Sequence, residues 1–170
     1  MVKETRIIDI ETYPLSVARP GVDIHKPDHY LPYWRELAEA GVRRNFYSLI
    51  VKITSSEGIS GYGEAIVREV PTAHKEIIDR LLKPIIINQD PLAIEDLWQR
   101  MFASLKTRGH IAGYFIEAIA GVDMALWDLM GKILGLPIYR ILRGPTMDKL
   151  KAYASSIYWH YLRGFSEKDF

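Results

Sequence analysis

The sequence predicts an α+β fold in which a small antiparallel sheet precedes a bundle of helices. Segments with the composition or alternation of strands come first, at 6–15, 46–54 and 59–65. Segments with the apolar spacing of helices follow, and a last strand is predicted at 149–157. Strands segregated from helices in this way are typical of α+β folds whose helices cover one face of the sheet.

The first strand is predicted from alternation. The even-numbered residues from Ile8 to Thr12 would lie on one face and the odd-numbered residues from Ile7 to Tyr13 on the other. Pro14 is expected to end the pairing or to mark an edge strand.

The second and third strands are predicted from composition and from the turn between them. Residues 46–54 are rich in β-branched and aromatic side chains. A turn that contains Gly58 predicts a hairpin with the third strand. Gly61 and Gly63 indicate a bend in that strand or the close approach of another backbone.

Three helices are predicted after the hairpin. The first begins near Pro71, and Pro84 is expected to interrupt it. The second is expected to begin with Asp90 as its N-cap and Pro91 at its first position. The third, at about 112–134, is the clearest, because it has a wide apolar face and a glycine where it should stop. A short helical turn is expected to follow it.

Composition excludes several functional classes. The chain has 22 basic and 21 acidic residues, so its charge gives no general attraction to nucleic acid or to anionic membranes. The absence of cysteine excludes a disulfide framework and a thiolate metal site. We find no apolar signal core and no apolar run of bilayer length, so a cytoplasmic protein with no membrane partner is predicted.

A connection of about thirty residues separates the first two strands, whereas the median connection has ~4–6 residues. Its aromatic and titratable residues include His25, His29, Tyr30, Tyr33 and Trp34. Such groups can contact a small polar substrate or close over a pocket. The alternative is a surface excursion whose aromatic residues pack on the domain. A zinc site at the two histidines is disfavoured, because Pro27 lies between them and no third ligand is evident.

Three motifs together carry a resemblance to a known family. They are the Gly-Tyr-Gly-Glu-Ala run at 61–65, the helical segment 118–132, and the segment 135–144 before the last predicted strand. Their order and spacing resemble the N-terminal capping domain of the mandelate racemase and muconate lactonizing enzyme branch of the enolase superfamily. The resemblance covers nearly the whole chain, from about residue 6 to residue 156.

The resemblance implies a two-domain enzyme. Residues 1–145 would form the capping domain, a three-stranded antiparallel meander followed by a helical bundle. Residues 146–170 would contain the first strand of a truncated TIM barrel. In the family the barrel binds Mg²⁺, which stabilises the enediolate formed when the proton α to a carboxylate is removed. The sequence stops before the Lys-x-Lys base motif and the metal carboxylates, so we expect no catalytic residue, no metal ligand and no bound Mg²⁺ in this chain alone.

The resemblance also implies that residues 19–44 and 66–70 cover the substrate. The residues expected near it are His25, His29, Tyr30, Trp34 and Arg68. These groups would orient the substrate and exclude water rather than make or break bonds. The long first loop is more similar to that of acid-sugar dehydratases and mandelate racemases than to that of cycloisomerases. A sugar-acid dehydratase or a racemase acting on a small carboxylate is therefore predicted, and dehydration is favoured.

Three acidic residues are expected to be structural. Glu64 lies at the end of a cap strand. Asp123 and Asp128 are five positions apart on the long helix, point in different directions, and are expected to cap or to pair with nearby Arg or Lys.

A second hypothesis is a non-catalytic binding or oligomerisation module. Its apolar last strand would expose an unpaired edge that carries Tyr153, Ile157, Tyr158 and Trp159. The expected partners are a barrel domain, in cis or in trans, and further copies of the chain as a homo-oligomer. The coding sequence just downstream of Phe170 would distinguish the two hypotheses.

Overall fold

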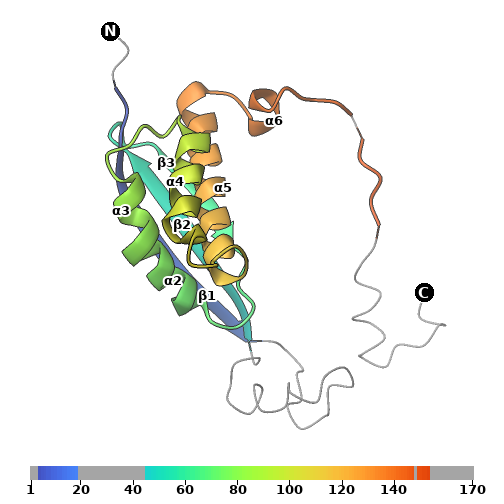
Figure 1. Cartoon of the computed structure of the whole chain (residues 1–170). Helices are drawn as coiled ribbons and strands as arrows, with labels where there is room; N and C mark the ends of the chain where they lie inside the picture. Colours follow the sequence, from blue (N-terminus) through green and yellow to red (C-terminus); the bar gives the residue numbers. More distant parts are fainter. Residues whose placement is uncertain (1–3, 19–44, 148, 154–170) are drawn as a thin grey trace, which may run out of the picture. The chain divides into compact units, whose positions relative to one another are not determined.

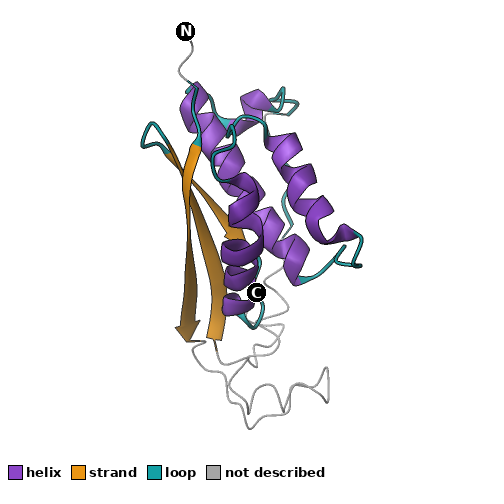
Figure 2. Cartoon of the chain, turned by 60° about the vertical axis from the view of Figure 1, so that its left-hand side comes forward, coloured by secondary structure: helices purple, strands orange, loops and turns teal. Residues whose placement is uncertain are grey.

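The computed structural model describes residues 4–18, 45–147 and 149–153 of the chain. The three strands form an antiparallel sheet in the order β1-β2-β3, with bounds Ile7–Ala18, Asn45–Ser55 and Ser60–Ala65. The helices are α2 (Pro71–Ile77), the π-helix η1 (Ile78–Leu82), α3 (Lys83–Ile86), α4 (Ile94–Lys106), α5 (Tyr114–Leu134) and α6 (Ile138–Ile141). The helices from α2 to α5 cover one face of the sheet (Figures 1 and 2). The α+β prediction is confirmed.

The chain divides into two compact units. The first, residues 1–138, contains the sheet and the helices from α2 to α5, and the second is residues 139–170. No helix among the described residues is long and apolar enough to cross a membrane. The first unit carries the core and is the part that positions the candidate site.

A β-bulge near the start of β1 changes which residues enter the core. The pairing of β1 with β2 shifts between Ile7 and Asp9. Ile7 and Ile10 are both buried, whereas Ile8 is 53% exposed. The prediction that Ile8 and Ile10 share a face is wrong, because the extra residue of a bulge reverses the alternation. Pro14 pairs within β1, which is an edge strand, so the edge interpretation of this proline is confirmed.

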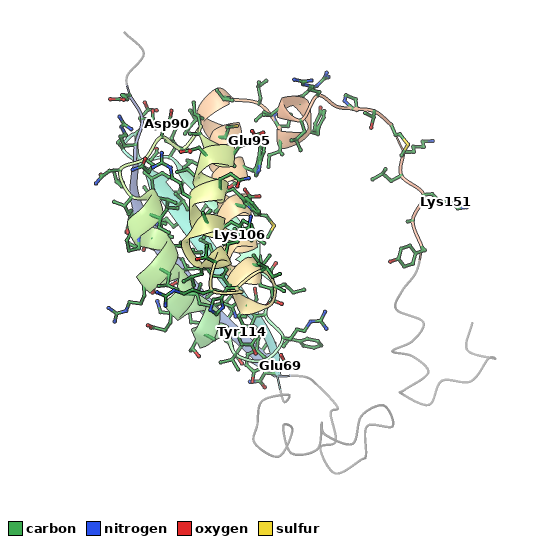
Figure 3. The ribbon with its side chains drawn as sticks, viewed as in Figure 1. Glu69, Asp90, Glu95, Lys106, Tyr114 and Lys151 are labelled. Carbon is green, nitrogen blue, oxygen red and sulfur yellow. The ribbon has the colours of Figure 1, made fainter. Side chains whose placement is uncertain are left out.

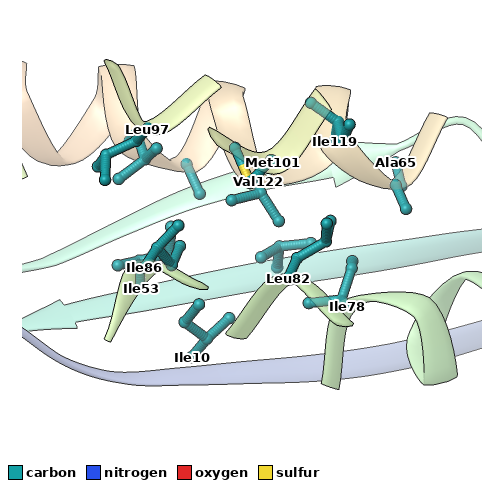
Figure 4. Packing of buried hydrophobic residues seen from close by; sticks show 14 of the residues in the cluster. Ile10, Ile53, Ala65, Ile78, Leu82, Ile86, Leu97, Met101, Ile119 and Val122 are labelled. Atoms are coloured by element: carbon teal, nitrogen blue, oxygen red, sulfur yellow. The ribbon is translucent and has the colours of Figure 1, made fainter. Parts of the chain in front are cut away.

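The core lies between the sheet and the helices. Figure 4 shows buried side chains from the sheet, from segment 78–86 and from α4 and α5 meeting in one cluster. Its largest fully buried members are Ile7, Ile10, Leu49, Ile53, Ile78, Leu82, Ile86, Leu97, Met101, Ile119, Leu126 and Leu129. Burial of each such side chain contributes about 1.5–3 kcal/mol, so this cluster is the main source of stability.

Backbone contact between β3 and α5 confirms the predicted close approach at the strand glycines. A Cβ atom on Gly61 would lie 2.2 Å from the carbonyl oxygen of Ala125. One on Gly63 would lie 2.2 Å from the carbonyl oxygen of Gly121. These distances leave no room for a side chain, so glycine is required where the strand meets the helix.

The helical chain continues past Pro84, so the prediction of an interruption there is wrong. The π-helix η1 lies immediately before α3, and Pro84 occupies the first turn of α3. Proline lacks an N–H and clashes with the carbonyl four residues earlier in an α-helix, and a wider π turn relieves both problems. Four buried side chains spaced four residues apart remain aligned across this segment: His74, Ile78, Leu82 and Ile86.

The ends of the later helices were predicted with mixed success. Asp90 accepts a hydrogen bond from the backbone N–H of Leu92 at 2.9 Å, and α4 begins only at Ile94. Asp90 therefore caps a turn, and the predicted start of this helix is wrong. At the end of α5, Gly135 adopts the left-handed conformation with φ of 64°, which confirms the predicted stop.

The predicted last strand is not present where the structure describes it. Residues 149–153 have no regular secondary structure, and residues 154–157 lie outside the described residues. A barrel strand obtains its hydrogen bonds from parallel neighbours. The described residues contain no strand after β3, so residues 149–153 have no such neighbour among them.

An ion pair joins the bulged strand to α3 and should make stability depend on pH. The Lys83 Nζ donates to Asp9 Oδ1 at 2.7 Å and to the carbonyl oxygen of Ile10 at 2.9 Å. The hydrogen bond from Lys83 is the main cause that lowers the pKa of Asp9. A lowered carboxyl pKa stabilises the fold above the unfolded value of about 3.9, and this contribution is lost as the pH falls through the folded value.

We therefore expect the stability difference between the wild type and Lys83→Met to be constant from pH 5 to 7 and to shrink below about pH 4. Both side chains are partly exposed, so the pH-dependent part should stay below about 1 kcal/mol. Urea unfolding at a series of pH values measures it. Arg80→Met, which removes a more exposed partner of Glu76, is the control. A difference that grows on acidification would contradict the assignment.

Candidate functional site

The two segments predicted to cover a substrate leave the sheet at the same end. Ala18 at the end of β1 pairs with Asn45 at the start of β2, so residues 19–44 leave and rejoin the sheet there. Ala65 at the end of β3 pairs with Leu49, and β3 runs in the same direction as β1. The end of the sheet at the Ala18–Asn45 pair is called the loop end (Figure 1). Segment 66–70 begins about 13 Å short of the loop end, because Leu49 is four residues from Asn45, and β3 runs toward that end.

Most of the predicted substrate-contacting residues lie outside the described residues. This applies to His25, His29, Tyr30 and Trp34, which belong to 19–44. Arg68 is described, and it lies exposed between β3 and α2. Its guanidinium makes no hydrogen bond or ion pair with the residues that the structure describes. A cationic group is therefore free to bind an anion near the loop end.

A buried histidine ties segment 66–70 to α5. His74 in α2 is fully buried. Its Nε2 lies 2.7 Å from a carboxylate oxygen of Glu117, and its Nδ1 lies 3.3 Å from the carbonyl oxygen of Val70. Its ring centroid lies 4.7 Å from that of Tyr114. Both polar partners are acceptors, so a neutral ring satisfies one of them and a doubly protonated ring satisfies both.

This histidine cluster, His74 with Glu117 and Tyr114, fixes the far end of segment 66–70. Val70 is the last residue of that segment, and Glu117 and Tyr114 belong to the first turn of α5. Figure 3 shows Tyr114 and Glu69 toward the loop end. The exposed Arg68 is thereby held between β3 on one side and the histidine cluster on the other.

Sequence reasoning missed the histidine cluster, although one signal was present. His74 lies four residues before Ile78, on the same apolar stripe of the predicted helix. A histidine on such a stripe is expected to be buried and therefore to need partners. The identity of those partners is not local information, because Glu117 is 43 residues away in the sequence.

The remaining acidic residues have different surroundings. Glu64 is exposed and accepts a hydrogen bond from the Ser48 hydroxyl at 2.6 Å. Asp128 accepts hydrogen bonds from the backbone N–H of Tyr62 at 2.7 Å and from Lys132 Nζ at 2.6 Å. The expected ion pair is confirmed for Asp128, which joins β3 to α5.

Asp123 does not follow the same prediction. Its side chain makes no hydrogen bond or ion pair within the described part of the chain, so the expected cap or ion pair is not found there. Asp123 is half-buried, and this burial raises the pKa of its carboxyl group.

The described residues do not fit the Mg²⁺ site that the resemblance implies for a full-length enzyme. No group of three or more His, Asp or Glu among them could hold a metal ion. No chemical step through a metal is therefore assigned to this chain. Among the described residues, the loop end presents the exposed guanidinium of Arg68 but no base and nucleophile in contact.

Comparisons with known proteins identify the family. The family described as mandelate racemase / muconate lactonizing enzyme, N-terminal domain, matches residues 32–143. The chain is 41% identical over 105 residues to D-galactonate dehydratase of Verminephrobacter eiseniae, covering 62% of this chain and 27% of that protein. It is 40% identical over 110 residues to D-galactonate dehydratase of Ralstonia pickettii, with the same coverage. The chain thus spans about a quarter of the length of these relatives.

Solved structures agree with the sequence comparison. A member of the enolase superfamily from Agrobacterium tumefaciens has a TM-score of 0.70 at 25% identity, covering 82% of this chain and 38% of that one. A mandelate racemase/muconate lactonizing protein from Paracoccus denitrificans, complexed with magnesium, has a TM-score of 0.62 at 29% identity, covering 86% and 32%. The family match, the sheet and the helices all lead to one conclusion: this chain belongs to the mandelate racemase and muconate lactonizing enzyme family of the enolase superfamily, and it contains the N-terminal domain of that family.

Proposed function

We propose that this chain is the substrate-capping domain of a sugar-acid dehydratase and is not catalytic by itself. The observation that carries the proposal is the common exit of segments 19–44 and 66–70 at the loop end of the sheet. Two segments that leave the same edge can close together over one ligand. The D-galactonate dehydratases among its relatives support an aldonic acid as the substrate class.

The proposal assigns a different role to each of two domains. Residues 1–145 would cap the site, and residues 146–170 would begin the barrel that supplies the base and the Mg²⁺ ligands. Arg68 would bind the substrate carboxylate or a hydroxyl group, because a guanidinium forms strong charge-assisted hydrogen bonds with such oxygens. The aromatic and histidine residues of 19–44 would exclude water and orient the sugar chain.

A fusion protein tests the proposal. In it, residues 1–145 of this chain replace the N-terminal domain of the Verminephrobacter eiseniae D-galactonate dehydratase. We expect Mg²⁺-dependent conversion of D-galactonate to its dehydrated α-keto acid. The product is measured by chemical derivatisation of its new keto group. The chain of 170 residues alone should show no turnover. Replacing 19–44 by a short Gly-Ser linker should lower kcat/KM by about 100-fold or more, because substrate positioning is lost.

Arg68 gives a sharper version of the same test. Arg68→Ala in the fusion should lower kcat/KM by about 10- to 100-fold, as expected for a lost hydrogen bond to a charged group, and Arg68→Lys should recover part of it. Arg80→Ala is the matched control, because Arg80 is equally cationic but lies on η1. Turnover by the chain alone, or a fusion indifferent to both changes, would refute the capping role.

A further inference from the structure

The three-stranded sheet has two edge strands, and each of them carries an ion pair that binds its backbone. The strand order β1-β2-β3 makes β1 and β3 the edges. The outward N–H and carbonyl groups of an edge strand can pair with a strand of another molecule. Groups that are already bound within the molecule are not available for such pairing, so the contacts along both edges decide whether the sheet can grow.

At the edge of β3, the ion pair belongs to α5. Asp128 Oδ2 accepts a hydrogen bond from the backbone N–H of Tyr62 at 2.7 Å. Lys132 Nζ donates to the carbonyl oxygen of Ser60 at 2.8 Å and lies 2.6 Å from Asp128 Oδ2. The same ammonium group lies 4.8 Å from the centre of the Tyr62 ring. The acid and the lysine thus bind the donor and the acceptor that a neighbouring strand would use.

At the edge of β1, the acid belongs to the strand and the lysine to α3. Asp9 Oδ1 accepts a hydrogen bond from the backbone N–H of Ile10 at 2.8 Å, and Lys83 Nζ donates to the carbonyl oxygen of Ile10 at 2.9 Å. Lys83 Nζ also lies 2.7 Å from Asp9 Oδ1. Both backbone groups of Ile10 are therefore bound by one ion pair. We call this pair and Asp128–Lys132 the edge pairs.

Two further features obstruct the β1 edge. Ile7 donates to the carbonyl oxygen of Gln89 at 3.0 Å and accepts from the N–H of Asn88 at 2.8 Å. Backbone groups alternate between the two sides of a strand, so Pro14 faces the same side as Ile10. Proline has no N–H and offers no donor to an added strand. The β1 edge is thus obstructed at three places, whereas at the β3 edge the described residues provide the ion pair alone.

The edge pairs are too exposed to be strong stabilisers of the fold. Their four side chains are between 32% and 46% exposed, and ion pairs at exposed sites contribute little to stability. On α4, Asp96 and Arg100 form a pair with the same four-residue spacing as Asp128–Lys132, at 2.7 Å, but it binds no strand within the described part of the chain. Contact with strand backbone is therefore the property that distinguishes the edge pairs.

We propose that the edge pairs prevent a second copy of this chain from adding its own edge strand to the sheet. The partner is a second copy because two identical β3 edges can pair antiparallel about a two-fold axis, each supplying the donor and the acceptor that the other lacks. Removal of Asp128 and Lys132 would leave the N–H of Tyr62 and the carbonyl oxygen of Ser60 free for that pairing. This role is separate from substrate capping and does not depend on the proposed function.

Double variants of the full chain test the proposal at β3. Asp128→Ala with Lys132→Ala, called the β3 variant, removes the edge pair. Asp96→Ala with Arg100→Ala, which removes one acid and one base from α4, is the matched control. Light scattering after size-exclusion chromatography gives the molar mass over a wide range of protein concentration. Hydrogen exchange at the Tyr62 amide is measured in the same samples, and circular dichroism checks the fold.

Exchange at the Tyr62 amide of the β3 variant should depend on protein concentration. In dilute solution it should be about 5- to 10-fold faster than in the wild type, because the N–H has lost its acceptor. In concentrated solution it should be slower than in the wild type, and the molar mass should rise to about twice the wild-type value, because a second copy then pairs at this edge. The α4 control should match the wild type in both measurements.

A proline substitution distinguishes strand pairing from association through another surface. Glu64 faces the same side of β3 as Tyr62, so its N–H is not needed for pairing with β2. Glu64→Pro in the β3 variant should return the molar mass to the wild-type value, because a proline at this position obstructs an added strand, as Pro14 does on β1. Asp128→Ala alone is the milder variant if the double variant does not fold, and it should also associate.

Three results would overturn the inference. Wild-type mass and wild-type exchange at Tyr62 in the β3 variant would show that the edge stays closed without its ion pair. Equal association of the α4 control would show that lost charge, and not an open edge, is the cause. Association that persists with Glu64→Pro would show that another surface is responsible.

Discussion

Gly63→Ala is expected to destabilise the domain by about 3 kcal/mol or more, the upper range for overpacking a rigid site. The new Cβ would lie 2.2 Å from the Gly121 carbonyl oxygen and 2.6 Å from the Ala125 nitrogen. Both are backbone atoms inside a helix, so neither can rotate away as a side chain would. Relief requires β3 and α5 to separate, which opens the core beneath them.

Chemical unfolding followed by circular dichroism measures this effect. Gly61→Ala should behave in the same way, because its Cβ would lie 2.2 Å from the Ala125 carbonyl oxygen. Glu64→Ala is the matched control in the same strand, since Glu64 is exposed and loses only the hydrogen bond from Ser48. It should cost less than about 1 kcal/mol. A Gly63→Ala protein as stable as the control would mean that strand and helix are not in direct contact.

Glu117→Leu is expected to cost about 1–3 kcal/mol, because it leaves the buried Nε2 of His74 without an acceptor. Glu117→Gln keeps an acceptor and should cost less. Removing both polar groups, in His74→Leu with Glu117→Leu, should recover much of the loss, since two apolar groups leave nothing unsatisfied. Urea unfolding of the three variants measures the differences. Glu76→Leu, at an exposed position of α2, is the control.

The same variants report on segment 66–70. If the histidine cluster fixes this segment, hydrogen exchange at its amides should accelerate in Glu117→Leu and not in Glu76→Leu. Equal exchange in the two variants would show that the cluster stabilises the core without positioning the segment.

The order and type of the main elements could be predicted from the sequence. The hairpin around Gly58 and the end of α5 at Gly135 depend on backbone conformations that neighbouring residues determine. The close approach at Gly61 and Gly63 was also predicted, because glycine in a strand is costly without such a reason. The family motifs were visible in the same segments.

The errors occurred where a local preference met a constraint from elsewhere in the fold. The bulge at the start of β1 places Ile7 rather than Ile8 in the core. The helical chain continues past Pro84 because a π turn precedes this proline. In both places, packing against the rest of the fold determines which residues are buried. The rules for strand alternation and for proline use only the local sequence, so they do not include this packing.

The candidate site divides in the same way. The amino-acid sequence shows which segments carry aromatic and cationic groups, and it singles out Arg68. The contacts of His74 and Glu117 that hold segment 66–70, and the half-buried position of Asp123 without a described partner, are visible only in the folded domain. Distance along the chain explains this difference. Secondary structure depends on residues a few positions apart, whereas a buried polar group is satisfied by whichever residue the fold brings to it, here one 43 positions away.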